Sequence, residues 1–190
     1  MYLIHFSHSY LEHRLPELDS LLVLNGLKRD DVYNINDYNP EYPFLKIKLP
    51  NDEVAKRIAD RAVLIKGIYE LWGEGIDLAS CAESIKKLDS QFVEPYFNEN
   101  SSWSLLVDGF GCTISYEKQD EYRQQFTDVL QFRGPVSIKN PDNSFRILLY
   151  YGLADEVKDI QYVYFCRFIS HGQRDIKNKF DLKKRKYIGM

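Results

Sequence analysis

The spacing of hydrophobic residues changes halfway through the stretch Phe44-Leu45-Lys46-Ile47-Lys48-Leu49-Pro50-Asn51-Asp52-Glu53-Val54-Ala55-Lys56-Arg57-Ile58-Ala59-Asp60-Arg61-Ala62. Its first six residues alternate apolar and basic side chains, which predicts a strand with one solvated face. Pro50, Asn51 and Asp52 form a helix start, and Val54, Ile58 and Ala62 then recur at i, i+4 and i+8 on one helical face. The stretch therefore predicts a strand followed by an amphipathic helix.

The residues on either side extend this pattern. Before it come a predicted strand at Tyr2–Ser7, a helix whose leucines repeat from Leu11 to Leu22, and a short strand at Val32–Ile35. After it, Val63–Leu71 is a mostly apolar strand. The order strand, helix, strand, strand, helix, strand is the ferredoxin-like split pattern, and it covers about residues 1–75.

A second group of helices and strands follows to about residue 165. The predicted helices are Asp77–Leu88 and about 117–131, and the predicted strands are Trp103–Phe110, Val136–Ile138, Phe145–Tyr151 and Tyr162–Ile169. The whole chain is therefore predicted to be α+β, with a ferredoxin-like subdomain followed by a second α/β subdomain.

Length and composition exclude several classes of protein. A chain of 190 residues with 44% hydrophobic content can bury a core. Its apolar runs are shorter than the roughly 20 residues of a transmembrane helix, and the first eight residues lack the basic start of a secretory signal. Cys81, Cys112 and Cys166 are widely spaced, so we expect reduced thiols in packing positions rather than a zinc site or a disulfide framework. These features predict a cytoplasmic protein.

The charge of the chain is distributed unevenly. Residues 161–190 contain eight Lys/Arg and two Asp/Glu, a net charge of +6, whereas residues 1–160 contain 17 and 26, a net charge of −9. A basic end on an acidic body suggests contact with a polyanion at one end of the chain.

Three stretches resemble the catalytic subunit of the eukaryotic tRNA guanine-10 N2-methyltransferase. They are His13-Arg14-Leu15-Pro16-Glu17-Leu18-Asp19-Ser20-Leu21, Ile68-Tyr69-Glu70-Leu71-Trp72-Gly73-Glu74-Gly75, and residues 164–189 with Gly172-Gln173-Arg174 and Leu182-Lys183-Lys184-Arg185-Lys186-Tyr187-Ile188-Gly189. Because they occur in the family's order and at about its spacing, the resemblance covers nearly the whole chain.

The resemblance implies a domain organisation. In this family a ferredoxin-like domain precedes a THUMP domain, which grips the acceptor end of tRNA, and Pro135–Asp142 is similar to the THUMP strand-and-turn signature. We therefore expect a ferredoxin-like subdomain at 1–75, a THUMP-like subdomain at 76–165 and a basic linker at 166–190. The family's Rossmann-like catalytic domain would begin after Gly189, so we expect no catalytic or cofactor-binding residues and no methylation by these 190 residues alone.

The resemblance also implies a cofactor and partners. The methyl donor of the full enzyme would be S-adenosylmethionine, and a small zinc-binding activator subunit would associate mainly with the missing domain. The RNA partner would be the acceptor end of tRNA.

Basic and polar residues near the C-terminus are the candidate RNA-binding residues. Cations neutralise phosphates, and aromatic neighbours such as Phe168, Phe180 and Tyr187 can stack on unpaired bases. The predicted RNA-binding residues are Lys139, Asn140, Arg146, Arg167, Arg174, Lys177, Lys183, Lys184, Arg185 and Lys186.

Each of these features has a simpler interpretation. Residues 166–190 also fit a solvated connector, Asn140-Pro141-Asp142-Asn143 also fits an ordinary turn, and Lys183–Lys186 also fits a nuclear localisation patch, which leaves the nucleus open as a compartment. The alternative function is a non-catalytic protein-interaction module with a basic connector tail, which the acidic body favours.

Other motifs predict no site. Asn39-Pro40-Glu41-Tyr42-Pro43-Phe44 is interpreted as a proline turn, because a glutamate interrupts the Pro-Pro-aromatic order of a methyltransferase motif. Gly73-Glu74-Gly75 and Gly109-Phe110-Gly111 lack the full glycine fingerprint of a nucleotide-binding loop and are interpreted as turns. His5, His8 and His13 have no accompanying ligand set, so no metal is predicted.

Overall fold

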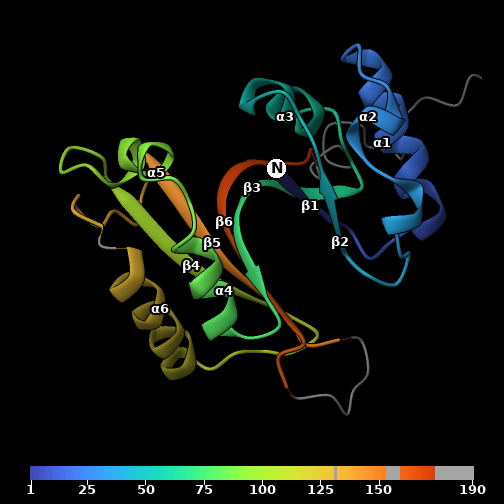
Figure 1. Ribbon diagram of the computed structural model, residues 1–190. Coiled ribbons are helices and arrows are strands. Elements are labelled where there is room, and N and C mark those ends of the chain that lie inside the picture. The colour runs from blue at the N-terminus through green and yellow to red at the C-terminus, as the bar shows by residue number, and fades with distance from the viewer. Residues whose placement is uncertain (131, 153–158, 174–190) are drawn as a thin grey trace, which may run out of the picture. The chain divides into compact units, whose positions relative to one another are not determined.

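The computed structural model describes residues 1–130, 132–152 and 159–173 (Figure 1). Six strands are hydrogen-bonded in the order β2-β1-β3-β6-β5-β4. The chain divides into two compact units. The N-terminal unit comprises residues 2–68 together with the described residues 169–173. The central unit comprises residues 69–168 together with Met1. β3 (Ile65–Gly75) and β6 (Tyr162–His171) contribute residues to both units.

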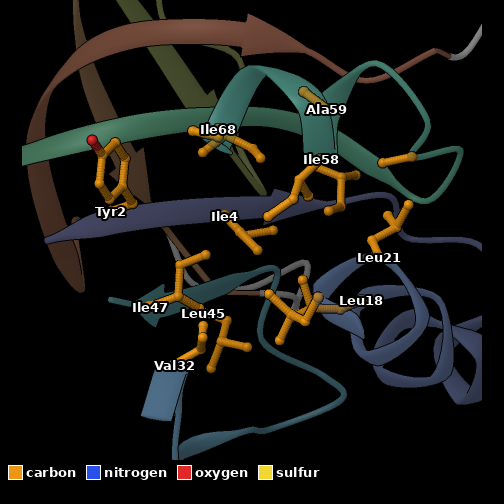
Figure 2. Close-up of a cluster of buried hydrophobic side chains, with 14 of the residues drawn as sticks. Tyr2, Ile4, Leu18, Leu21, Val32, Leu45, Ile47, Ile58, Ala59 and Ile68 are labelled. Carbon is orange, nitrogen blue, oxygen red and sulfur yellow. The ribbon is translucent and has the colours of Figure 1, made fainter. Parts of the chain in front are cut away.

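The N-terminal unit alternates short strands with helices. Its elements besides the start of β3 are β1 (Tyr2–Phe6), η1 (Leu11–His13), α1 (Arg14–Leu24), α2 (Arg29–Val32), η2 (Ile35–Asp37), β2 (Phe44–Ile47) and α3 (Asp52–Ala59). β1 and β2 are antiparallel, with Tyr2 opposite Ile47 and His5 opposite Phe44. The apolar faces that the sequence predicted meet in one core, in which Ile4, Leu18 and Ile58 are fully buried (Figure 2).

The first turn of α1 holds three connecting segments in place. Arg14 is fully buried, and its guanidinium donates hydrogen bonds to the carbonyl oxygens of Ser7 (2.8 Å) and Pro40 (2.7 Å). Three residues on, in the same turn, the carboxylate of Glu17 accepts hydrogen bonds from the backbone N–H groups of Val63 (2.8 Å) and Leu64 (2.9 Å). Buried backbone groups need such partners, so these two side chains fasten the loops around α1.

The α+β class predicted from the sequence is confirmed, and one of the local corrections lies in the N-terminal unit. The predicted strand at Val32–Ile35 is wrong, because Val32 ends the helix α2 and Ile35 begins η2. The cause is local hydrogen bonding: the side chain of Asn34 accepts a bond from the backbone of Asn36 and starts a helical turn. Residues 1–75 therefore follow the order β1-α1-β2-α3-β3 once the short helices are set aside, one strand fewer than predicted.

The central unit places helices on one face of four strands. After β3 come α4 (Leu78–Ile85), α5 (Ser90–Phe97), β4 (Trp103–Phe110), α6 (Tyr116–Leu130), β5 (Asn143–Tyr150) and β6. β4 and β5 are parallel and joined through α6, whereas β5 and β6 are antiparallel. The helix α5 was not predicted. Its apolar residues do recur at i, i+4 (Phe92 and Tyr96, Val93 and Phe97), but Pro95 lies inside it and it is only eight residues long, so its helical conformation depends on packing.

The indole of Trp72 is the centre of the core in this unit. It is 3% exposed, and its ring lies within 5.0–5.7 Å of the rings of Phe92, Tyr96, Phe97 and Phe145. Three of these rings belong to α5, so Trp72 attaches α5 to the sheet.

Replacing Trp72 by alanine should destabilise the protein by about 3–5 kcal/mol, because the change removes a buried aromatic side chain and leaves a cavity. Urea unfolding followed by circular dichroism would measure the loss. Tyr116→Ala is the control, since that aromatic side chain is 76% exposed on α6 and its loss should change stability by less than about 0.5 kcal/mol. Equal unfolding midpoints for the two variants would contradict the central position of Trp72.

Candidate nucleic-acid interface

Residues Phe132–Asp142, which we call the signature loop, connect α6 to β5 and contain the predicted THUMP-like stretch. The loop is closed at its end by Ser102, just before β4. The backbone N–H and the hydroxyl of Ser102 donate hydrogen bonds to the carboxylate of Asp142, at 2.8 and 2.6 Å. The backbone N–H of Asp142 in turn donates to the Ser102 hydroxyl at 3.0 Å. These bonds join the end of the loop to the start of β4.

The start of the signature loop is held by Trp103, the first residue of β4. The indole Nε1 donates to the carbonyl oxygen of Gly134 (2.8 Å), and the backbone of Trp103 bonds to Pro135 and Ser137. The Trp103 ring also stacks on Phe132, with centroids 4.1 Å apart. Gly134 is required here, because a Cβ would lie 1.9 Å from the carbonyl oxygen of Ser101. Val136 thus forms an isolated parallel bridge to Trp103 and not the predicted strand at Val136–Ile138.

The tip of the signature loop displays Lys139 and Asn140 to solvent. Asn140 has a left-handed backbone conformation (φ 49°), which asparagine tolerates better than most residues. The hydroxyl of Ser137 donates to the carbonyl oxygen of Lys139 at 2.8 Å, and Ile138 is 91% exposed. A cation, a side-chain amide and an apolar side chain are therefore presented together on a braced turn.

Arg146 and Arg167 lie in the central sheet with partners in the same unit. Arg146 on β5 is 3.2 Å from the carboxylate of Asp108, and Arg167 on β6 is 2.8 Å from that of Glu70. The side chains of the two arginines are only 18% and 12% exposed. Their ion-pair partners belong to β4 and β3 and not to the signature loop, and direct RNA contact by the two arginines stays a prediction. Arg174, Lys177, Lys183, Lys184, Arg185 and Lys186 lie outside the described residues.

Arg133 is a basic residue of the signature loop that sequence reasoning missed. Its side chain is 58% exposed, and its Nη1 is 3.3 Å from a carboxylate oxygen of Glu94 on α5. The signal in the sequence was its position two residues before the Pro135–Asp142 stretch. The candidate interface therefore contains Arg133, Lys139 and Asn140 on one loop.

The described residues offer little for other kinds of site. Among residues 1–130, 132–152 and 159–173, no group of three or more His, Cys, Asp or Glu side chains could hold a metal ion. Within the same ranges, no helix is long and apolar enough to span a membrane. Cys81 and Cys166 are buried, and burial raises the pKa of both thiols, whereas Cys112 is exposed and the prediction that it packs in the core is wrong.

Comparison with known families shows to which family the chain belongs. Residues 1–174 match the family model described as the Tmrp11 THUMP N-terminal domain. The match covers most of the chain, and the chain therefore belongs to this family. The tRNA (guanine(10)-N(2))-methyltransferase TRMT11 of Mus musculus is 32% identical over 190 residues, which cover 99% of this chain and 40% of that protein. The chain spans about 40% of the length of such relatives and corresponds to their N-terminal THUMP-containing region. The resemblance stated from the sequence is confirmed.

Two solved structures share the fold. The crystal structure of TrmN from Thermus thermophilus has a TM-score of 0.53 at 11% identity and covers 97% of this chain and 50% of that chain. The crystal structure of PH1313 from Pyrococcus horikoshii Ot3 has a TM-score of 0.51 at 14% identity and covers 90% and 55%. At these identities the likeness concerns the fold alone.

The closure of the signature loop can be tested through the pKa of Asp142. The hydroxyl and then the backbone N–H of Ser102 stabilise the carboxylate, so the pKa of Asp142 lies below its ordinary value of about 3.9. The stabilisation is present above that ordinary value and is lost as pH falls through the lower pKa of the folded state. NMR titration of the carboxyl carbon would measure it.

Ser102→Ala should raise the pKa of Asp142 toward the ordinary value. Ser137→Ala is the matched control, because that hydroxyl donates to the Lys139 carbonyl and should leave the pKa of Asp142 unchanged. A titration of Asp142 that is the same in wild type and Ser102→Ala would show that the loop is closed in another way.

Proposed function

We propose that this chain binds tRNA and positions it for S-adenosylmethionine-dependent N2-methylation of guanosine 10. The observation that carries the proposal is a braced, exposed loop bearing Arg133, Lys139 and Asn140 in a chain of the Tmrp11 THUMP N-terminal domain family. The relatives that the chain matches are named for the guanine(10)-N(2) methylation of tRNA. RNA-binding modules of this kind hold the backbone through cations and read shape or unpaired ends.

The charge distribution supports a local RNA contact. Because residues 1–160 carry a net charge of −9, a polyanion must be bound at a confined basic patch. Lys139 supplies one cation and Asn140 supplies amide donors at the loop tip, and the fastening of the loop at both ends limits the entropy lost on binding. Arg174, Lys177, Lys183, Lys184, Arg185 and Lys186 add positive charge from the C-terminal stretch, for which the proposal rests on the sequence alone.

The remaining parts of the proposal concern the whole enzyme. We place the methyl transfer, and the binding of S-adenosylmethionine, outside residues 1–190, and we expect a small zinc-binding activator subunit as partner. Within the chain we propose a ferredoxin-like subdomain at 1–75 and a THUMP-like subdomain at 76–165. The basic linker expected at 166–190 can begin only after β6, which ends at His171. The proposed compartment is the cytoplasm, with the nucleus open because of Lys183–Lys186.

The first experiment measures binding of the chain to mature tRNA and to the same tRNA without its 3′ single-stranded end, each at two salt concentrations. Salt-sensitive binding that needs the 3′ end is expected, because each neutralised phosphate releases counterions. The alternative, a protein-interaction module, predicts no tRNA binding even at low salt, and protein docking through an apolar face depends far less on salt.

A charge reversal at the loop tip tests the interface directly. Lys139→Glu should weaken tRNA binding and make the slope of log affinity against log salt shallower by about one, because one phosphate contact is lost. Lys118→Glu is the matched control: it makes the same charge change at an exposed lysine near the start of α6, whereas the signature loop lies beyond the end of that 15-residue helix. Equal losses in both variants would mean that Lys139 acts only through the overall charge.

A further inference from the structure

A pocket of about 200 Å³ lies on the helical side of the central unit. Three segments meet there: the end of α4, the middle of α5 and the last turn of α6, followed by the start of the signature loop. Its apolar lining residues are Ile85, Leu88, Val93, Phe97, Val129 and Leu130. Ile85, Phe97 and Leu130 are 4–9% exposed, so the floor of the pocket is part of the core.

The polar groups of the pocket are of both signs. Lys86 and Arg133 bring positive charge, and Glu94 brings a carboxylate. Lys86 is itself in an exposed ion pair with Glu83, and such a pair costs little to open. Arg133 and Glu94 are 3.3 Å apart with side chains 58% and 61% exposed, and such a solvated ion pair opens at little cost. A bound molecule can therefore donate a hydrogen bond to the carboxylate of Glu94 while its own negative charge lies against Arg133 and Lys86.

Arg133 joins this pocket to the proposed RNA-binding loop. It lines the pocket and also belongs to the signature loop, whose Phe132 packs on the pocket residue Phe97 with ring centroids 4.8 Å apart. An RNA strand held by Lys139 and Asn140 would thus be bound by the same loop that contributes Arg133 to the pocket. The pocket and the loop both belong to the central unit.

We propose that this pocket receives one unpaired nucleobase with an exocyclic amine, from the single-stranded part of the RNA bound at the signature loop. The flat ring lies against the apolar floor, the amine donates to the carboxylate of Glu94, and the phosphate of the same nucleotide lies beside Arg133 and Lys86. The apolar floor suits the face of a base, the single acceptor suits the amine at its edge, and the two cations suit the phosphate of the backbone. This inference rests on the proposed tRNA binding.

The test uses the whole chain and a tRNA with 2-aminopurine in place of the last adenosine of its 3′ single strand, because the fluorescence of this base reports its stacking. Wild-type protein should change the fluorescence on binding. Val129→Phe, which fills the pocket from α6, should abolish the fluorescence change and lower affinity on the order of tenfold, the contribution of one stacked base. Val23→Phe is the control, at a valine 73% exposed on α1.

A second comparison tests the hydrogen bond to Glu94 without changing the pocket shape. With wild-type protein, a tRNA ending in adenosine should bind more tightly than one ending in purine riboside, which differs from adenosine only in lacking the exocyclic amine, and Glu94→Gln should reduce this preference. Arg133→Gln should weaken both RNAs alike. Unfolding midpoints equal to wild type would establish that the variants are folded.

The outcomes separate the two proposals. If wild-type protein binds tRNA but Val129→Phe leaves the affinity and the fluorescence change as in wild type, the pocket inference is overturned while the proposed tRNA binding stands. A side chain of a partner protein would then be the remaining candidate occupant of the pocket. If wild-type protein binds no tRNA at low salt, the proposed function fails and the pocket inference fails with it.

Discussion

The packing of aromatic rings around Trp72 is the constraint on which the central unit depends. α5 is short and contains Pro95, and Phe92, Tyr96 and Phe97 from this helix all contact the indole. The indole Nε1 also donates to Glu70 at 2.9 Å, and the same carboxylate oxygen accepts from Arg167. One side chain on β3 thereby connects a helix, a strand and an ion pair. Without it, one wall of the pocket beside the signature loop would lose its support.

The signature loop shows how a candidate binding surface is built from residues that do not bind. Trp103, Ser102 and Gly134 have structural roles: a stacked ring, a hydrogen-bonding hydroxyl and a space that admits no Cβ. Their combined effect is to leave Lys139 and Asn140 exposed on a turn whose ends are fixed. Rigid support of this kind favours binding, because less conformational entropy is lost when a ligand is held.

The arginines of the central sheet illustrate why charge in a sequence is a weak guide to a site. In the sequence, Arg146 and Arg167 are not distinguishable from the other predicted RNA-binding cations. In the structure Arg146 faces Asp108, and Arg167 pairs with Glu70 while lying 4.8 Å from the ring centroid of Tyr96. Half-buried cations need partners that neutralise them, and those partners lie 38 and 97 residues away in the chain. By contrast, Arg133 drew no attention in the sequence, because only folding places it beside Lys86 and Glu94.

The sequence by itself determined the α+β class, the bounds of β4 and, within a few residues, of α3 and α6, and the family, because period, helix caps and motif order are local properties of the chain. It did not predict α5, it predicted a strand where Asn34 starts a helical turn, and it could not separate paired from exposed cations. The turn at Asn34 rests on a local hydrogen bond that the apolar pattern did not reveal. The packing of α5 against Trp72 and the pairing of the cations depend on contacts between residues far apart in the chain. Only the tertiary structure decided them, since the free energy of burying a ring or pairing a charge is set by neighbours that the local sequence does not contain.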